Sequence, residues 1–491
     1  MTERLLERFP FLNRDWIILS GMMALILLLS GLFFANQSLR LDEAQSLWQT
    51  SRTPLGILRI IAEDVHVPFY HLILHFWQQF LGSSVIIARF LSLTFFMLSV
   101  PAMYYLCRLA YSRSFALFTT LLIAVSPFLN WYGNEIRMYS LLTFVTILNQ
   151  YFFLRIYKQA GSGNWIFYGL TAVFGIFTHY FFGLMLATQA IFFFLYSDRF
   201  PRKSLSRFAS VAIAIAITFV PWIFYVQSMG AAGNTKPSIP EPTSINVFNT
   251  FSHFLFGFQN DTINTILVSM WPLTVILGFL AVGKGKKLTA ETMYFILSVI
   301  VPIAAVFILS ITYRPLYLSR YLILTLPSLY IFISWIFSTY SPSVSKVAKS
   351  ALLLVMFTTL TVQAVSATNP VREDYKDVAA RLNAETKPQD IVIVTSPFTI
   401  YPLEYYYRGH SKIATLPLWD RYQVGPIPAF DESQLPNQVD QLKSHHKRAF
   451  VVMSYDQGYH DKIKHYLDNN FKKLDQERFS PGLDLYVYEL Y

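Results

Sequence analysis

Residues 16–35 read WIILSGMMALILLLSGLFFA and contain no charged side chain. A helix needs about 20 apolar residues to cross the roughly 30 Å hydrocarbon core of a bilayer. Arg4, Arg8 and Arg14 precede this run, as basic residues precede the apolar core of a signal peptide. The apolar part of a cleaved signal peptide is only about 7–15 residues long, however, and many more apolar runs follow here. The sequence therefore predicts a retained first transmembrane helix.

Ten further apolar runs follow, so we expect a polytopic α-helical membrane protein with about eleven transmembrane helices. They lie near residues 84–107, 115–130, 139–156, 165–180, 181–197, 208–227, 263–282, 290–312, 321–340 and 350–367. The composition agrees, because 54% of the 491 residues are hydrophobic and only 14% are charged. Soluble domains carry about 25% charged residues, and disordered chains are poor in aromatic and aliphatic residues. Both classes are excluded. The single cysteine, Cys107, excludes an intrachain disulfide and a cysteine zinc cluster.

The positive charge follows the predicted topology. The net charge is +10, from 39 Lys and Arg against 29 Asp and Glu. Many of these cations occupy the N-terminus and alternate loops, which hold few acids. The basic residues in these loops are Arg108, Arg113, Arg155, Lys158, Arg199, Arg202, Lys203, Arg207, Lys284, Lys286, Lys287, Lys346 and Lys349. The positive-inside rule places them and the N-terminus in the cytoplasm. We therefore expect a multi-pass protein of a bacterial inner or plasma membrane, and no nucleic-acid partner.

This topology puts residues 36–82, 130–138, 228–262 and the chain after about residue 368 on the extracytoplasmic side. In the last part, short apolar runs at 391–396, 449–454 and 484–490 predict strands, and residues 374–384 predict an amphipathic helix. We expect a membrane domain over 1–367, which includes the outer loop 36–82 with interfacial helices, and a small extracytoplasmic α/β domain over 368–491.

The first outer loop begins with LDEAQSLWQT, which places Asp42 and Glu43 just beyond the first predicted span. A carboxylate at the membrane surface can act as a general base toward an acceptor hydroxyl. The alternative is structural, because Asp and Glu favour the first turn of a helix.

Three histidines follow in EDVHVPFYHLILHFWQQFLG, residues 63–82. Residues 69–80 place Phe69, Leu72, Phe76 and Phe80 on one face, as in a helix that lies in the membrane interface. His71 and His75 are four residues apart and can chelate a metal, but interfacial helices also carry histidines without a ligand role, and we expect no metal site.

Ionisable residues also occur at the outer ends of later spans. Glu135 and Arg137, within WYGNEIRMYS (131–140), form either a functional pair or a structural ion pair. His179 is either a pocket residue or a satisfied interfacial histidine. Arg314 and Arg320, in TYRPLYLSRYLI, lie in outer regions poor in cations. Guanidinium groups bind phosphate through paired donors, either on a substrate or on ordinary lipid headgroups.

The order of these motifs resembles the dolichyl-phosphate-mannose-protein mannosyltransferase-like family of GT-C glycosyltransferases, to which the bacterial lipid A aminoarabinose transferase is related. The matching motifs are an acidic pair after the first span, the HxPxY element of His66, Pro68 and Tyr70, ARFLS at 88–92, the ExRxY element of Glu135, Arg137 and Tyr139, SRYL at 319–322, and REDYKDVAARL at 372–382. Each motif alone is weak, but their order and shared outer placement are specific. The chain is similar to the bacterial branch of this family.

The resemblance implies transfer of a sugar from a polyprenyl-phosphate donor at the outer membrane face. It implies that Asp42 is the base, that Glu43 supports it, and that the donor and its phosphate contact the residues that match family motifs. We expect these substrate-binding residues to be His66, Tyr70, Glu135, Arg137, Tyr139, His179, Arg314 and Arg320. The resemblance also implies direct inverting displacement, without a cofactor or an essential metal.

Two other classes remain to be weighed. A transporter or lipid flippase of a lipid-linked sugar also needs polar groups in the membrane, but it should place them near the midplane. A structural protein would leave the outer acids and arginines unexplained. The enzyme interpretation fits best, with membrane lipids as surroundings and a glycolipid, a cell-wall glycan or a protein as acceptor. The pattern does not identify the sugar.

Overall fold

The computed structural model describes residues 14–64, 66–158, 161, 163–229, 239–269, 276, 280, 288–366, 373–423, 427–444 and 446–491. Contacts divide the chain into two compact units. The first comprises Met1–Ala35, His66–Tyr225 and Pro237–Ser366, and we call it the helical unit. The second comprises Asn36–Val65, Val226–Lys236 and Ala367–Tyr491, and we call it the α/β unit.

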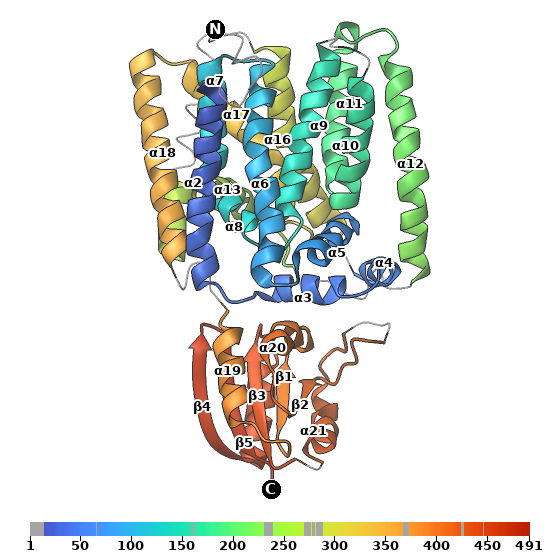
Figure 1. Ribbon diagram of the computed structural model, residues 1–491, viewed down its shortest axis with the longest axis vertical. Coiled ribbons are helices and arrows are strands. Elements are labelled where there is room, and N and C mark those ends of the chain that lie inside the picture. Colours follow the sequence, from blue (N-terminus) through green and yellow to red (C-terminus); the bar gives the residue numbers. More distant parts are fainter. Residues whose placement is uncertain are drawn as a thin grey trace. The chain divides into compact units, whose positions relative to one another are not determined.

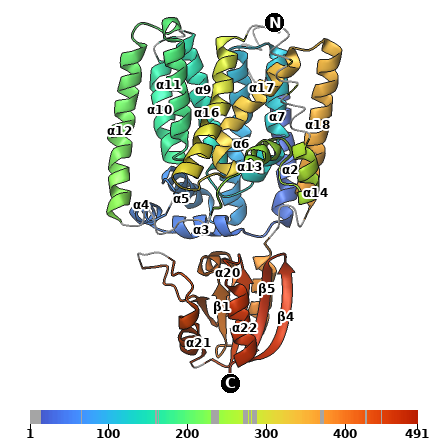
Figure 2. The same ribbon diagram turned by 180° about the vertical axis from the view of Figure 1, so that it is seen from behind.

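Long apolar helices make up the helical unit (Figures 1 and 2). Within the described residues, six segments are long and apolar enough to cross a membrane, or seven if one bent pair counts as a span. They are α2 (Arg14–Asn36), α6 (Val85–Arg108), α12 (Ser204–Ser228), α16 (Ala290–Thr312), η3 with α17 (Ser319–Thr325 and Leu326–Ser338) and α18 (Pro342–Val365). The polytopic helical fold is confirmed, whereas the count of eleven is not.

The other predicted spans explain the lower count. The run at 139–156 forms α9 (Tyr139–Tyr157), which is not among the six segments. The runs at 165–180 and 181–197 form α10 (Asn164–Thr178) and α11 (Phe182–Leu195), and these two helices are too short for a full span. The run at 115–130 is bent by 56° between α7 (Arg113–Ala124) and α8 (Pro127–Gly133). The run at 263–282 lies mostly outside the described residues, apart from α14 (Asp261–Ser269).

The bend between α7 and α8 has a local cause. Pro127 has no backbone N–H to continue the helix, and its ring clashes with the preceding turn. The hydroxyl of Ser126 restarts the helix, because it accepts a hydrogen bond from the backbone N of Leu129 at 3.2 Å. The same hydroxyl accepts from the Tyr330 hydroxyl on α17 at 2.8 Å. The bend is therefore anchored to a neighbouring helix.

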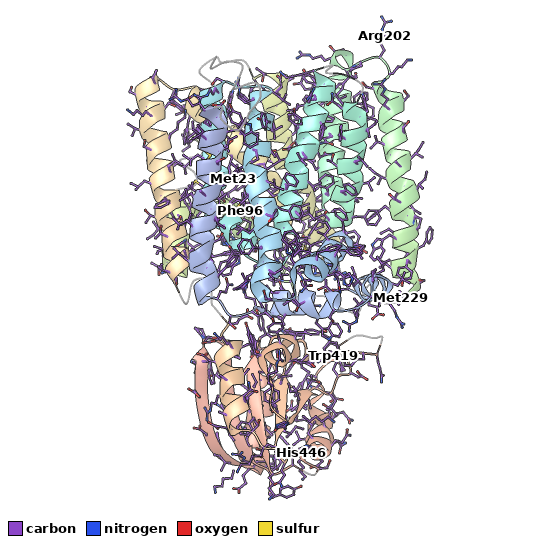
Figure 3. The ribbon with its side chains drawn as sticks, viewed as in Figure 1. Met23, Phe96, Arg202, Met229, Trp419 and His446 are labelled. Atoms are coloured by element: carbon purple, nitrogen blue, oxygen red, sulfur yellow. The ribbon has the colours of Figure 1, made fainter. Side chains whose placement is uncertain are left out.

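One end of the helical unit carries ionic contacts between helices. The Arg113 guanidinium at the start of α7 binds Asp15 on α2 (Nε–Oδ1 2.6 Å), and Lys158 at the end of α9 binds Glu291 on α16 (3.0 Å). In Figure 3, Arg202 and Met229 mark the two ends of α12, and the starts of α2 and α7 lie at the Arg202 end. This is the end that the charge pattern assigns to the cytoplasm, and that orientation stays a prediction.

A buried network of polar side chains joins four helices in the interior of this unit. The Gln189 amide on α11 donates to Asn149 Oδ1 on α9 (2.7 Å) and to the Tyr294 hydroxyl on α16 (3.1 Å). Its Oε1 accepts from the Tyr168 hydroxyl on α10 (2.9 Å). Asn149 also donates to Thr171 on α10 at 3.1 Å. All five residues are at least 90% buried, so the network fixes how these helices pack.

A five-stranded sheet with strand order β2-β1-β3-β5-β4 forms the core of the α/β unit. Strands β1 (Ile391–Thr395), β2 (Lys412–Leu416) and β3 (Arg448–Ser454) are parallel, whereas β4 (Lys472–Ser480) and β5 (Leu483–Glu489) complete it as an antiparallel hairpin. In Figure 3, Trp419 follows the carboxyl end of β2 and His446 precedes the amino end of β3. The two residues therefore mark the carboxyl and amino ends of the parallel strands.

Helices cover both faces of this sheet (Figures 1 and 2). They are α19 (Tyr375–Glu385), α20 (Ile400–Tyr406), α21 (Leu435–Lys443) and α22 (His460–Asn470). On one face, Ile463 and Leu467 of α22 and Val439 of α21 pack with Ile393 and Val451 from the central strands. The helix predicted at 374–384 is thus α19, and the three predicted strands are β1, β3 and β5.

Residues of the first outer loop also belong to the α/β unit, although the sequence analysis counted this loop with the membrane domain. They form α3 (Leu41–Thr50) and α4 (Pro54–Ala62). The Leu39 backbone N donates to the Tyr406 hydroxyl at 2.8 Å, and the Trp48 ring packs against Tyr401 at 4.9 Å between centroids. The loop is therefore anchored on α20. The next helix, α5 (Phe69–Leu81), lies in the helical unit.

The buried amide network leads to a stability prediction. Gln189→Leu removes one hydrogen-bond partner from each of Asn149, Tyr168 and Tyr294. We therefore expect the free energy of unfolding to fall by about 1–3 kcal/mol. Thermal unfolding of the detergent-solubilised protein would measure this loss. Thr218→Val on α12 is the matched control, because its hydroxyl bonds only carbonyls of its own helix. Equal melting temperatures for both variants would contradict the prediction.

Candidate functional site

The predicted Glu135 and Arg137 lie in the short connection between α8 and α9. Both side chains are buried, with 4% and 3% of their surface exposed. The backbone N of Arg137 donates to the Glu135 carbonyl at 2.7 Å, which makes the connection tight. Gly133, just before it, packs so closely that a Cβ atom would lie 2.6 Å from the Phe96 ring. A glycine is therefore required for this connection to approach α6.

Arg137 contacts the predicted His66 directly, through its Nη2 and the His66 Nε2. Guanidinium nitrogens only donate hydrogen bonds, so His66 Nε2 is the acceptor and the ring is the neutral tautomer protonated at Nδ1. The Tyr180 hydroxyl donates to the His66 carbonyl at 3.3 Å and accepts from Trp222 Nε1 on α12 at 3.3 Å. His66 is thus held on both its backbone and its side chain.

Tyr70 reaches the same connection through Ser92 of the ARFLS motif. The Tyr70 hydroxyl and Ser92 Oγ share a hydrogen bond of 2.9 Å, and Ser92 Oγ donates to the Arg137 carbonyl at 3.2 Å. The motif also holds Arg89, which is 2% exposed. The ARFLS pattern alone predicts no role for Ser92, whereas the structure shows that Ser92 links α5, α6 and the Arg137 connection.

Arg320 and His179 belong to the same neighbourhood of the helical unit. The Arg320 guanidinium lies over the Tyr321 ring, 5.6 Å from its centroid, and both Arg320 and Arg137 are within electrostatic range of His179 and Tyr139. The His179 ring lies 5.3 Å from the Tyr321 ring, and its Nδ1 accepts from the backbone N of Phe181 at 3.1 Å. Two guanidinium groups in one largely buried, aromatic region can bind the oxygens of a phosphate strongly.

A helix that the sequence analysis did not identify holds the SRYL segment in place. In α13 (Ser244–Phe256), Thr250 Oγ1 shares hydrogen bonds of 3.1 Å with Ser319 Oγ and with the Tyr317 hydroxyl. His253 Nδ1 shares another of 3.1 Å with Ser319 Oγ. In the sequence, the feature that could have indicated this role is a threonine and a histidine three residues apart in a predicted outer segment. These contacts fix the residue that directly precedes Arg320.

Arg314 stands apart from this set, whereas the His71 ring stacks on the His66 ring at 6.2 Å between centroids. The backbone N of Arg314 donates to the Leu309 carbonyl at 3.1 Å. Its guanidinium makes no hydrogen bond or ion pair with another described residue. His71 and His75 are buried on α5. The described residues contain no group of three or more His, Cys, Asp or Glu placed to hold a metal.

Asp42 and Glu43 lie at the start of α3, in the α/β unit. Glu43 is fully buried, and its Oε2 accepts from the backbone N of Arg40 at 3.0 Å. This contact satisfies a donor at the helix start, which is the capping role that the sequence analysis had left open. Asp42 is partly exposed, and its carbonyl accepts from Ser46 Oγ at 2.9 Å. The two acids therefore differ in environment.

Glu373 is a third carboxylate beside this helix start. Its Oε2 accepts from the backbone N of Leu41 at 3.1 Å, and its Oε1 accepts from the Tyr455 hydroxyl and lies 3.9 Å from Arg40 Nε. Burial raises the pKa of Glu373, and the negative charge of Asp42 acts in the same direction. REDYKDVAARL contains Glu373, but no pattern in the sequence connects it with Asp42.

The helical arrangement can now be compared with known proteins. Residues 65–225 match the profile of the dolichyl-phosphate-mannose-protein mannosyltransferase family. The structure is similar to ArnT from Cupriavidus metallidurans in the apo state, with a TM-score of 0.63, 13% identity and coverage of 96% of this chain and 98% of that one. The chain has the GT-C glycosyltransferase fold.

Other solved structures share the GT-C fold with this chain. ArnT bound to undecaprenyl phosphate matches with a TM-score of 0.63 and 12% identity, over 97% of this chain and 98% of that one. The Archaeoglobus fulgidus oligosaccharyltransferase in the apo form matches with a TM-score of 0.54 and 12% identity, over 90% and 70%. No curated protein matches the chain in sequence. At these identities the likeness establishes the fold.

Glu373 gives the α/β unit a pH dependence whose sign can be derived. Because burial raises its folded-state pKa above the unfolded value of about 4.3, the native state holds the proton more strongly. Stability from this group is therefore greatest below the unfolded pKa and falls as the pH rises through the folded pKa. Glu373→Gln removes this titrating group. We therefore expect the melting temperature of the variant to fall less than that of wild type between about pH 4 and pH 7.

The control for this experiment is Glu432→Gln, an exposed glutamate of the same unit, which should follow wild type. Parallel curves for Glu373→Gln and wild type across that range would show that Glu373 does not titrate differently in the folded state.

Proposed function

We propose that this protein is an integral-membrane glycosyltransferase that moves a sugar from a polyprenyl-phosphate donor to an acceptor at the extracytoplasmic face. The observation that carries the proposal is that Arg320, over the Tyr321 ring that packs against His179, and Arg137 lie in one neighbourhood of a GT-C fold. ArnT has been crystallised with undecaprenyl phosphate, and AglB from Archaeoglobus fulgidus has been solved with an inhibitory peptide and a dolichol-phosphate. These neighbours support a lipid phosphate as the ligand.

The proposed reaction is a direct displacement. The acceptor hydroxyl oxygen forms a bond to the anomeric carbon while Asp42 takes its proton. The bond from that carbon to the phosphate oxygen breaks, and its electron pair stays on the polyprenyl phosphate. Negative charge therefore grows on the leaving oxygens, where fixed guanidinium groups stabilise it best in a site poor in water. Displacement from the opposite side inverts the anomeric centre.

Four of the remaining residues have roles that their contacts or positions support. Glu43 caps α3 and so positions Asp42, while His66, Tyr70 and Glu135 hold or flank Arg137. Arg314 lacks the supporting contacts that Arg320 has, so its role as a phosphate ligand rests on the resemblance alone. We assign a cell-membrane location with a cytoplasmic N-terminus from the charge pattern. The acceptor class is a glycolipid, a cell-wall glycan or a protein.

The role of Asp42 is tested by release of free polyprenyl phosphate from a panel of polyprenyl-phosphate sugars, with detergent-purified protein. Asp42→Asn removes the base, so we expect the release rate to fall by about 100- to 10,000-fold. Glu43→Gln is the matched control, since an amide oxygen can still accept from the Arg40 backbone, and it should keep most of the rate. Equal rates for Asp42→Asn and wild type would remove Asp42 as the base. Failure of wild type to bind any donor would contradict the proposed function.

Arg320 is tested by equilibrium binding of undecaprenyl phosphate. Arg320→Gln removes a charged donor, worth about 1.5–3 kcal/mol, so we expect Kd to rise roughly 10- to 100-fold. Arg202→Gln, an exposed arginine at one end of α12, should bind as wild type does. The same Kd for all three proteins would show that Arg320 does not bind the phosphate.

A further inference from the structure

A cavity of about 610 Å³ opens at the carboxyl edge of the sheet in the α/β unit. Its wall includes Ser454 at the end of β3, Leu483 at the start of β5, and His460 at the start of α22. The cavity therefore lies on the β3 side of the sheet, where the parallel strands give way to the antiparallel hairpin of β5 and β4. Ligands of open α/β sheets commonly bind outside the carboxyl ends of the parallel strands.

The loops at this edge adopt costly backbone conformations. Ser396 follows β1 with φ 59°, and Tyr455 follows β3 with φ 55°. Side chains other than glycine rarely adopt this left-handed region, and such outliers cluster at ligand sites. Ser396 Oγ donates to the Tyr455 carbonyl at 2.7 Å, and His460 Nε2 lies 3.2 Å from Ser396 Oγ and 3.1 Å from Thr395 Oγ1. Hydrogen bonds therefore tie the end of β1 to Tyr455 and His460, and these two residues line the cavity.

The charges in the wall favour a neutral, hydroxylated ligand. Four carboxylates (Glu373, Asp456, Asp461 and Asp484) face three cations (Arg40, Lys464 and Arg478). An anion such as phosphate would meet more negative than positive side chains. A saccharide can donate to the carboxylates and accept from the cations. Lys464 Nζ also lies 5.4 Å from the centre of the Tyr486 ring, which gives the wall an aromatic surface beside a charged donor.

The cavity also adjoins the segment that carries the proposed base. Arg40 lines it, and Glu373 in its wall accepts from the backbone N of Leu41 at 3.1 Å. Asp42 is the next residue, and its charge acts on Glu373. We infer that this cavity binds a saccharide unit of the acceptor, an inference that rests on the proposed function. The volume is within the range of about 300–1,000 Å³ that small-molecule sites occupy.

The test is saturation-transfer NMR on the full chain in lipid nanodiscs, which avoids competition from glycoside detergents. The probes are maltose, chitobiose and α-1,6-mannobiose. The double variant Lys464→Ala, Asp461→Asn changes the cavity wall. Lys462→Ala is its matched control on the same helix, because Lys462 is exposed and pairs with Glu432 at 2.7 Å, outside the cavity.

We expect wild type and Lys462→Ala to bind at least one disaccharide. For the double variant, we expect the saturation-transfer signal to be at least five-fold weaker while the melting temperature stays the same. Binding by none of the three probes, or equal signals from the double variant and wild type, would overturn the inference. The release assay separates this result from the proposed function. Disaccharide binding by a protein that consumes no polyprenyl-phosphate sugar would leave the saccharide site standing and refute its acceptor role.

Discussion

The packing of the helical unit depends on the hydrogen bonds of one buried amide. Gln189 bonds to Asn149, Tyr168 and Tyr294, which lie on three other helices. Apolar side chains do not select partners well in a bilayer, because lipid tails are as apolar as leucine. A buried amide is selective, since its donors and acceptor must all be paired. The network thereby fixes α9, α10, α11 and α16, and α9 in turn begins at the Arg137 connection.

Near the proposed reaction, some polar residues position other side chains, and others are proposed to contact the substrate. Glu43 is occupied by the start of its own helix, and His66 is occupied by Arg137. Ser92 and Ser319 do not carry charge, but each fixes the backbone or neighbour of an arginine. This division is common in sites that must hold charged groups in a fixed place before the substrate arrives. It also explains why buried polar side chains occur in a unit that is otherwise apolar.

The sequence predicted elements whose pattern is local, and it did not predict pairings between distant segments. The uncharged run at 16–35 and the buried strand at 391–395 are recognisable because burial on all sides demands continuous apolar residues. Strand β4 was missed because seven of its nine residues are exposed and five are charged. Asp42 and Arg137 were singled out by their position at the outer ends of predicted spans, and the resemblance gave them roles. Glu373, Tyr455 and Thr250 act through partners far away in the sequence.

The hydrogen bond between Leu41 and Glu373 joins residues that are 332 positions apart. A ribosome adds about 5–20 residues per second, so the first partner waits roughly 20–60 s for the second. During that interval α3 lacks the contact at its first turn, and the neighbouring Asp42 lacks its final surroundings. The start of α3 is thus completed only after Glu373 has been synthesised, and a product truncated before Glu373 would carry α3 without this contact.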